Sequence, residues 1–154
     1  MKPFKKILFP VDLSDVSPKI MPWVIMMAER FEAQIHLLFV ARTFEHFSTL
    51  NLTQVTIDDF SLRITEGAEE KLKEFAETEF KEYSDCITQV INGDPSHKIL
   101  DYAASENIDL IIMGTHGRKG LNRVFFGSVA DNVVKMSPVP VMTINPYRVI
   151  KAEW

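Results

Sequence analysis

Cysteine is almost absent from this sequence of 154 residues, in which Cys86 is the only one. A single cysteine cannot form a disulfide within the chain, which fits a protein of the reducing cytoplasm. The sequence also lacks any apolar run near the roughly 20 residues that a transmembrane helix needs. The first apolar run, Ile7-Leu8-Phe9, is too short for a signal peptide. We therefore expect a cytoplasmic protein without membrane contact.

The sequence also has a small net charge and few glycines. The net charge of −4 argues against a broad nucleic-acid surface, so no nucleic-acid partner is expected. The histidines show no metal-ligand spacing, so no metal site within the protein is expected. Only six glycines are present, and four of them fall between Ile108 and Lys135. The hydrophobic fraction of 46% is typical of a globular protein, and the length suits one domain.

Apolar patterning predicts strands that alternate with helices, because short apolar runs indicate buried strands and apolar residues at helical spacing indicate amphipathic helices. The expected strands are Lys6–Phe9, closed by Pro10, then Gln34–Val40, Cys86–Ile91, Leu110–Met113 and Val139–Ile144. The expected helices are Pro18–Phe31 with Ser17 as its N-cap, about Asp59 to Tyr83, a helix capped by Asp94 or Ser96 that ends at Asn107, and Gly127–Met136. Ala41–Asp58 is expected to be a loop.

This alternation predicts an α/β fold in which a parallel sheet lies between two helical layers, forming a three-layer sandwich. The domain is expected to span residues 1–146, with residues 147–154 as a C-terminal tail. Pro140 has no backbone N–H to donate to a ladder, so the last strand is expected at a sheet edge.

The glycine-rich stretch after the fourth strand has the form of a phosphate-binding loop. Its pattern is Gly114-x-x-Gly117, nine residues, then Gly127-Ser128 at the start of a helix. Glycine lets the backbone approach an anion, and a helix start offers unpaired N–H groups with partial positive charge. The sequence has no Walker A loop, and its first strand is not followed by the glycines of a dinucleotide fingerprint.

This glycine pattern resembles that of the universal stress protein family, in its nucleotide-binding branch. The resemblance covers most of the chain, since the first strand runs into Val11-Asp12, Gly93-x-Pro95 precedes a helix, and Val139-Pro140-Val141 opens the last strand. It implies a five-stranded parallel sheet of order 3-2-1-4-5, flavodoxin-like or adenine nucleotide α-hydrolase-like. In that order the winding reverses between the first and fourth strands, where ligands bind in open α/β sheets. Asp12 and Gly114 lie just beyond these strands.

The resemblance also implies a site for ATP, or for ADP or AMP, together with Mg²⁺ or Mn²⁺. Asp12 would face the ribose or adenine. Pro10, Val11, Val40 and Ala41 would flank the base, and Met113 would lie beside the nucleotide. The phosphates would be held by Gly114, Gly117, Gly127, Ser128, Val129 and Ala130. His116, Arg118, Lys119 and Arg123 are further candidates for phosphate contacts.

Each of these residues also has a purely structural interpretation. Asp12 is equally suited to a turn, and Gly127-Ser128 to the simple start of a helix. The basic residues of the loop are compatible with solvated charge, and a lone loop histidine such as His116 is more often exposed than functional. Cys86 begins a strand without a basic neighbour in sequence, which favours a structural thiol over a nucleophile.

Three functions remain open. The first is an ATP-binding sensor or regulator of the stress response, with a protein partner that the sequence does not name. The second is a slow ATPase or phosphotransferase, for which only His116 and Asp12 are candidate groups and no catalytic residue is assigned. The third is a dimeric interaction module without a physiological nucleotide. The resemblance implies a homodimer through the last strand, Val139–Ile144, whose edge carries unpaired backbone groups.

Overall fold

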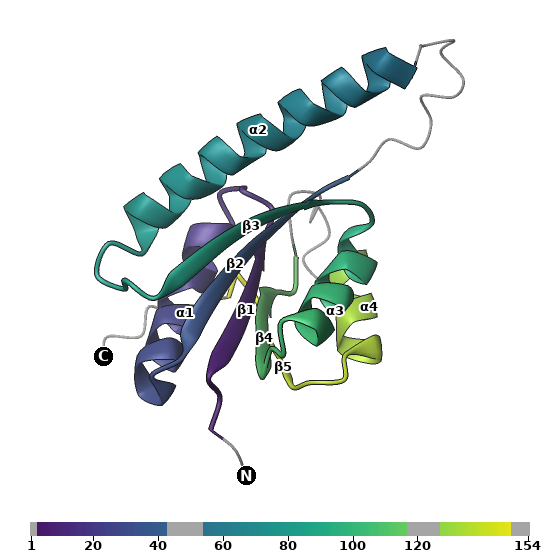
Figure 1. Cartoon of the computed structure of the whole chain (residues 1–154). Coiled ribbons are helices and arrows are strands. Elements are labelled where there is room, and N and C mark those ends of the chain that lie inside the picture. The colour runs from purple at the N-terminus through teal and green to yellow at the C-terminus, as the bar shows by residue number, and fades with distance from the viewer. Residues whose placement is uncertain (1–2, 43–53, 117–126, 149–154) are drawn as a thin grey trace.

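The computed structural model describes residues 3–42, 54–116 and 127–148 (Figure 1). The strands in these ranges are β1 Lys6–Val11, β2 Gln34–Ala41, β3 Cys86–Asn92, β4 Leu110–Gly114 and β5 Val141–Ile144. The helices between them are α1 Ser17–Phe31, α2 Gln54–Glu79, α3 Pro95–Ser105 and α4 Ser128–Met136. None of the helices within these ranges combines the length and the apolar character that spanning a bilayer requires.

The strands form a five-stranded parallel sheet of order β3-β2-β1-β4-β5, which confirms the predicted fold class and strand order. α1 and α2 cover one face of the sheet, and α3 and α4 cover the other (Figure 1). β5 is an edge strand, as the proline ahead of it predicted, although it begins at Val141 rather than at Val139.

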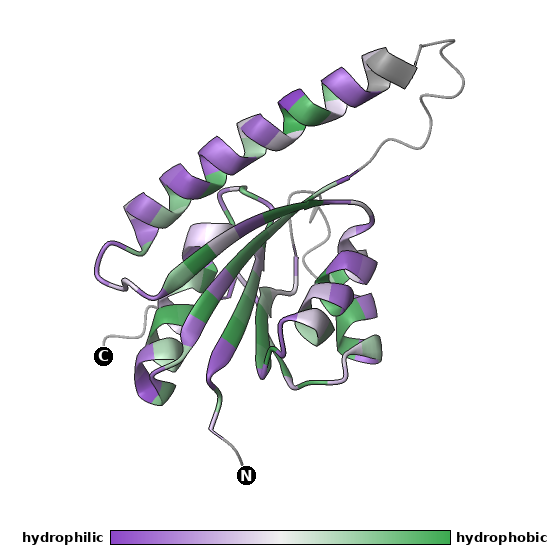
Figure 2. Ribbon diagram, viewed as in Figure 1, coloured by the Kyte–Doolittle hydropathy of each residue, from purple (hydrophilic) through white to green (hydrophobic). Residues whose placement is uncertain are grey.

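The sheet is buried on both faces because successive strand residues pack into different cores. Ile7 and Phe9 of β1 belong to the core under α1 and α2, whereas Leu8 belongs to the core under α3 and α4. All three side chains are fully buried. In Figure 2 the apolar residues are concentrated along the strands, and polar residues cover much of α2. A strand buried on both faces reads as a continuous apolar run, which is the pattern seen in the sequence.

The ladder between β1 and β4 is the shortest in the sheet. β1 pairs with β2 along its whole length, but with β4 only at Ile7 and Leu8. β4 continues to Gly114 with β5 as its ladder partner. The ladder between β1 and β4 therefore ends below their carboxyl ends, where the winding of the sheet reverses.

β1 continues through Pro10, where the sequence predicted its end. The carbonyl oxygen of Lys6 accepts a hydrogen bond from the Asp109 N–H (2.9 Å), which places the backbone groups of Lys6 on the β4 side. Successive strand residues direct their backbone groups to opposite neighbours, so Pro10 also faces that side. Pro10 has no N–H to donate to β4, so the ladder between β1 and β4 ends before it, and β1 continues through its ladder with β2, in which Pro10 pairs with Leu38.

The starts of α1 and α2 differ from the prediction. Ser17 is the first residue of α1, not its N-cap, and Val16 takes the N-cap position. α2 begins at Gln54, before the predicted start at Asp59, and Ala41 belongs to β2, so the loop predicted for Ala41–Asp58 is wrong at both ends. Residues 43–53 lie outside the described ranges. The apolar pattern does not predict the first turns of α2 because they extend past the strands and bury little (Figure 1).

The start of α3 was predicted more closely. Asp94, one of the two candidate caps, is the N-cap, and its carboxylate accepts a hydrogen bond from the His97 N–H at 3.1 Å. The helix ends at Ser105, before the predicted Asn107, which adopts a left-handed φ of 54°. Asparagine tolerates that conformation better than most residues, so it suits the turn that leads into β4.

Candidate functional site

The carboxyl ends of β1 and β4 bring together two segments that are far apart in the sequence. Asp12 directly follows β1, and Thr115 directly follows β4. The two strands are neighbours in the sheet, and the ladder between them ends before this level. The candidate site is therefore this edge of the sheet, where the Asp12 turn and the glycine-rich segment were predicted to come together.

Asp12 is held in a turn that leads into α1. Its Oδ1 atom accepts hydrogen bonds from the Ser14 N–H (3.1 Å), the Ser14 hydroxyl (2.6 Å) and the Ser17 hydroxyl (3.2 Å). Because Ser17 is the first residue of α1, the carboxylate also lies at the positive end of a helix dipole. Asp12 thus makes the turn contacts that its structural interpretation predicts. Its half-buried position at the end of β1 is also the one expected of a ligand-facing residue.

Gly114 ends β4 at a point where a side chain would be crowded. A Cβ atom at this position would lie 2.6 Å from Cδ1 of Ile20 on α1 and 3.0 Å from the carbonyl oxygen of His116. Both distances are shorter than an ordinary van der Waals contact. The absence of a side chain lets β4 turn closely against α1, so this glycine of the motif has a packing reason of its own.

A backbone hydrogen bond joins the two ends of the segment between β4 and α4. The N–H of Gly127 donates to the carbonyl oxygen of Thr115 at 2.7 Å, and the Thr115 N–H donates to Ile144 of β5 at 2.9 Å. A Cβ atom on Gly127 would lie 3.4 Å from the Thr115 oxygen, and the φ of Gly127 is −63°. Neither its backbone conformation nor its packing against the described part of the chain requires glycine here. Glycine instead leaves the start of α4 unobstructed.

α4 starts without a side-chain cap. Its N-cap residue is Gly127, which has no side chain that could accept a hydrogen bond from the first turn. Ser128, Val129 and Ala130 form that turn, in which Ser128 is exposed and Ala130 is buried. Uncapped N–H groups at the positive end of a helix dipole suit an anionic ligand. The predicted phosphate-binding residues of this turn therefore lie next to the end of β4.

His116 is buried, so the expectation of an exposed loop histidine is wrong. The residue is 6% exposed, and its Nδ1 atom lies 2.8 Å from the Thr115 hydroxyl. Its ring meets Tyr147 edge to face, with centroids 5.7 Å apart, and the Lys19 ammonium lies 5.6 Å from the same tyrosine ring. Among the described residues, His116 Nε2 is the one buried side-chain nitrogen or oxygen without a hydrogen-bond partner.

The apolar residues predicted to lie near the nucleotide are mostly core residues at the same edge of the sheet. Val11 packs in the core under α1 and α2, whereas Val40 and Met113 pack in the core under α3 and α4. Ala41 is buried and Pro10 is half-buried. Because most of these side chains are covered by protein, contact with a base would fall chiefly to their backbone groups.

The remaining candidates for phosphate contacts lie outside the described residues. These are Gly117, Arg118, Lys119 and Arg123. Their roles stay predictions. Within residues 3–42, 54–116 and 127–148, the structure places no group of three or more His, Cys, Asp or Glu side chains where they could hold a metal ion.

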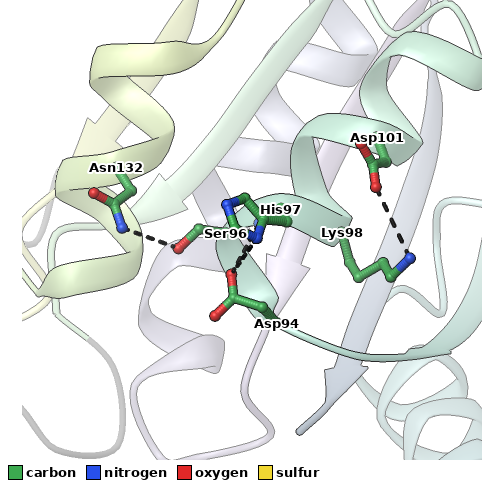
Figure 3. Close-up of polar contacts among 6 residues, drawn as sticks. All are labelled: Asp94, Ser96, His97, Lys98, Asp101 and Asn132. Atoms are coloured by element: carbon green, nitrogen blue, oxygen red, sulfur yellow. Dashed lines mark hydrogen bonds and ion pairs between the residues drawn. The ribbon is translucent and has the colours of Figure 1, made fainter. Parts of the chain in front are cut away.

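A second polar cluster lies at the start of α3 (Figure 3). The exposed His97 imidazole has its Nδ1 atom 3.6 Å from Asp94 Oδ1. Ser96 is buried, and its hydroxyl accepts a hydrogen bond from the Asn132 side chain on α4 at 3.5 Å. Figure 3 shows Ser96 directed toward Asn132 rather than toward His97. The cluster therefore caps α3 and links it to α4, and it does not have the geometry of a serine nucleophile activated by histidine.

Cys86 begins β3 and is half-buried. Burial, and after it the nearby Asp85 carboxylate, raises the pKa of the Cys86 thiol to about 11. Such a thiol is almost entirely protonated near neutral pH, and the thiolate is the reactive form. This supports the structural interpretation of Cys86.

The Asp12-x-Ser14 spacing is a turn signal, and the hydrogen bonds from Ser14 to Asp12 form that turn. Sequence reasoning did not identify Tyr147 or Lys19 as parts of this region. Tyr147 carries no comparable signal, because it reaches His116 only through the placement of β5 beside β4.

Known proteins share this architecture. The model of the Universal stress protein family matches residues 3–145. Universal stress protein YxiE of Bacillus subtilis is 30% identical, over 92% of this chain and 99% of its own. Universal stress protein MJ0577 of Methanocaldococcus jannaschii is 29% identical over 92% of this chain and 94% of its own. A solved structure of MJ0577 aligns over 94% of this chain and 97% of its own with a TM-score of 0.81 and 26% identity. A universal stress protein solved in complex with cAMP shares the fold, with a TM-score of 0.60 at 17% identity over 94% of this chain and 99% of its own.

Proposed function

Because this chain belongs to the universal stress protein family, we propose that it is an ATP-binding sensor or regulator of the stress response. The observation that carries the proposal is the 2.7 Å hydrogen bond between the Gly127 N–H and the Thr115 carbonyl oxygen. This bond holds the uncapped start of α4 at the end of β4, beside the switch point of the sheet.

In the proposed complex with an adenine nucleotide, the residues would have the following roles. The N–H groups of Ser128, Val129 and Ala130 would bind phosphate oxygens, and Asp12 would face the ribose or adenine. The base would lie at the ends of β1 and β2, against Pro10, Val11, Val40 and Ala41, with Met113 and Gly114 nearby. Gly117, Arg118, Lys119 and Arg123 would complete the phosphate contacts, and a bound Mg²⁺ or Mn²⁺ would neutralise phosphate charge. The related protein solved with cAMP holds an adenine nucleotide on the same fold.

The proposed output is binding rather than rapid hydrolysis. Fast phosphoryl transfer needs a base or water-positioning group and charge aligned along the transferred phosphoryl group. Of the two candidate groups, His116 has Nδ1 engaged with Thr115, and Asp12 Oδ1 accepts three hydrogen bonds. Backbone donors that bind the ground state as well as the transition state give affinity without rate.

Assembly into a homodimer through β5 is part of the proposal. β5 is an edge strand in which Val141, Met142 and Thr143 are half-buried. On the adjoining α4, Val134 is 46% and Met136 is 70% exposed. Apolar side chains beside an open strand edge favour pairing with a second copy. Light scattering at micromolar concentration is expected to give the dimer mass, and a monomer mass would count against this assembly.

Titration calorimetry with ATP and Mg²⁺ tests the nucleotide site. Gly127→Val places a branched side chain at the start of α4 and is expected to weaken ATP binding by at least about 10-fold. Gly67→Ala is the matched control, because Gly67 lies on α2 with no atom within 4 Å of an added Cβ. Equal affinity of the natural chain and Gly127→Val would refute the pocket assignment.

The nucleotide itself can be identified from freshly purified protein. Denaturing the protein should release an adenine nucleotide, which mass spectrometry identifies as ATP, ADP or AMP. A protein that neither carries nor binds nucleotide would favour the interaction module. Turnover of roughly 1 per second or faster would instead make the protein an ATPase.

A further inference from the structure

The sheet has two edges, and the proposed homodimer uses only one of them. β5 forms that edge, and β3 forms the opposite edge (Figure 1). A molecule that paired with copies of itself through both edges would continue to add copies, because each new copy would present another free edge. An assembly that stops at two copies therefore needs β3 to be closed to strand pairing.

The composition of β3 gives its edge little protection. The 7 residues of Cys86–Asn92 include neither a proline nor a charged residue. Lysine and proline commonly protect sheet edges, and a short uncharged segment of high β-propensity is the kind that pairs with other chains. Ile87, Thr88 and Gln89 are exposed, so the middle of the strand is open to solvent. β3 therefore needs another means of excluding a partner strand.

The ladder with β2 shows which backbone groups of β3 face outward. The carbonyl oxygen of Asp85, just before the strand, accepts a hydrogen bond from the Ile35 N–H at 2.9 Å, so the backbone groups of Asp85 face β2. Successive strand residues direct their backbone groups to opposite sides. Thr88 and Val90 therefore direct their N–H and carbonyl groups away from β2, toward the position that a partner strand would take.

The side chain of Gln89 occupies one of these outward groups. Its Nε2 atom donates a hydrogen bond to the carbonyl oxygen of Val90 at 3.1 Å. The amide thus fills an acceptor that an incoming strand would need. At the carboxyl end of the same strand, Asn92 Nδ2 donates to Thr65 Oγ1 of α2 at 3.0 Å, which ties that end to the helix. Side chains of the protein itself therefore engage two points of the edge.

We propose that Gln89 closes the β3 edge to strand pairing, so that a second copy of this chain pairs at β5 alone. The inference rests on the homodimer of the proposed function and deepens it, because it limits the assembly to two copies. A strand that approached β3 would have to displace the Gln89 amide and would lose the benefit of one hydrogen bond. The role of Gln89 is therefore to exclude a partner from this edge.

Sedimentation equilibrium over a range of micromolar concentrations tests this assignment. Gln89→Ala removes the amide and leaves the backbone of β3 in place. It is expected to strengthen association through β3 by about 5- to 10-fold, the effect of no longer displacing one hydrogen bond, and so to give masses above the dimer. Ile87→Ala is the matched control, because it shortens an exposed side chain of the same strand that cannot donate to a carbonyl group. Unchanged association in Gln89→Ala, or an equal increase in Ile87→Ala, would overturn the inference.

Two further variants test whether the added association uses the edge of β3. The N–H of Thr88 faces outward, so Thr88→Pro forfeits no hydrogen bond to β2 and should restore the dimer mass when it is added to Gln89→Ala. Gln89→Lys places a donor and a charge at the same point and should remain a dimer. Masses above the dimer that persist after Thr88→Pro would show that the copies associate through another surface, against the proposal.

A block at β5 separates failure of this inference from failure of the proposed homodimer. Ile144 accepts a hydrogen bond from the Thr115 N–H of the β4 side, so the backbone groups of the preceding residue, Thr143, face outward. Thr143→Pro should therefore make the natural chain a monomer, and Gln89→Ala combined with Thr143→Pro should form dimers through β3. A natural chain that is already a monomer would refute the β5 homodimer, whereas the inference would still require Gln89→Ala to associate more strongly. A dimeric natural chain with equally dimeric Gln89→Ala would refute the inference alone.

Discussion

Gly114 at the end of β4 and Ile20 on α1 approach so closely that a Cβ at position 114 would lie 2.6 Å from Cδ1 of Ile20. Gly127 has no comparable constraint, since its Cβ would make only an ordinary contact at 3.4 Å. The two glycines therefore occur in one motif for different reasons. Packing against α1 constrains Gly114, whereas no such constraint acts on Gly127 among the residues that the structure describes.

Gly114→Ala is therefore expected to lower the free energy of unfolding by about 1–3 kcal/mol through overpacking. Ile20→Val removes the Cδ1 atom, and alone it should cost about 0.5–1.5 kcal/mol. Combined, the two changes should cost less than their sum, because the second makes room for the first. Urea unfolding of the four proteins measures this coupling. Strict additivity would show that the Cβ clashes elsewhere.

Asp12→Ala is expected to lower the free energy of unfolding by about 1–2 kcal/mol, because it removes the acceptor for Ser14 and Ser17 at the start of α1. Asp12→Asn keeps an oxygen at Oδ1 and should retain most of that stability. Both variants should bind ATP more weakly if the carboxylate faces the ribose. Urea unfolding and calorimetry separate these effects, and full stability in Asp12→Ala would mean that the turn hydrogen bonds contribute nothing.

His36 should make the fold sensitive to acid. Burial of its ring, followed by the Lys6 ammonium, lowers the pKa of His36 below its ordinary 6.5, outweighing the carboxylates of Glu106 and Asp85. The unfolded chain then binds a proton that the folded chain does not. The contribution of His36 to stability is complete above pH 6.5 and is lost as the pH falls through the folded-state pKa.

Urea unfolding of the natural chain and of His36→Gln, measured from about pH 7 to pH 5, isolates this contribution. The natural chain should lose stability more steeply toward acid than the variant. Parallel curves would show that His36 titrates alike in the folded and unfolded chains.

Gly67→Ala is expected to raise the free energy of unfolding by about 0.5–1 kcal/mol, because glycine weakens a helix interior relative to alanine. Gly67 lies within α2, and an added Cβ meets no atom within 4 Å. Gly93→Ala should do the opposite, since Gly93 has a φ of 145° and its Cβ would lie 2.8 Å from the Lys98 side chain. Thermal unfolding measures both, and a destabilised Gly67→Ala would contradict this account of α2.

Much of the fold follows from local patterns in the sequence. The runs that became β1, β2 and β4 are apolar because both faces of the sheet are covered, so their presence could be predicted without knowing any contact. Boundaries depend on neighbours and were harder to predict. Pro10 ends a strand in most settings, but here the ladder with β2 lets β1 continue through it.

The candidate site was predictable in its backbone but not in its side chains. The glycine spacing led to the start of α4 at Gly127 and to Asp12 at the end of β1. The burial of His116 could not be predicted, because Tyr147 covers it from beyond β5 and no local pattern links residues so far apart. The bond between Thr115 and Gly127 likewise depends on how the chain returns to the end of β4.

The short ladder at Ile7 and Leu8 divides the sheet in the same place as the chain order does. β1, β2 and β3 come from residues 6–92, whereas β4 and β5 come from residues 110–144. A nucleotide bound at the carboxyl ends of β1 and β4 would contact Asp12 in the first part of the chain and α4 in the second. It would link two parts of the sheet that share only a two-residue ladder. The free energy of unfolding of the whole protein would then rise with the nucleotide concentration.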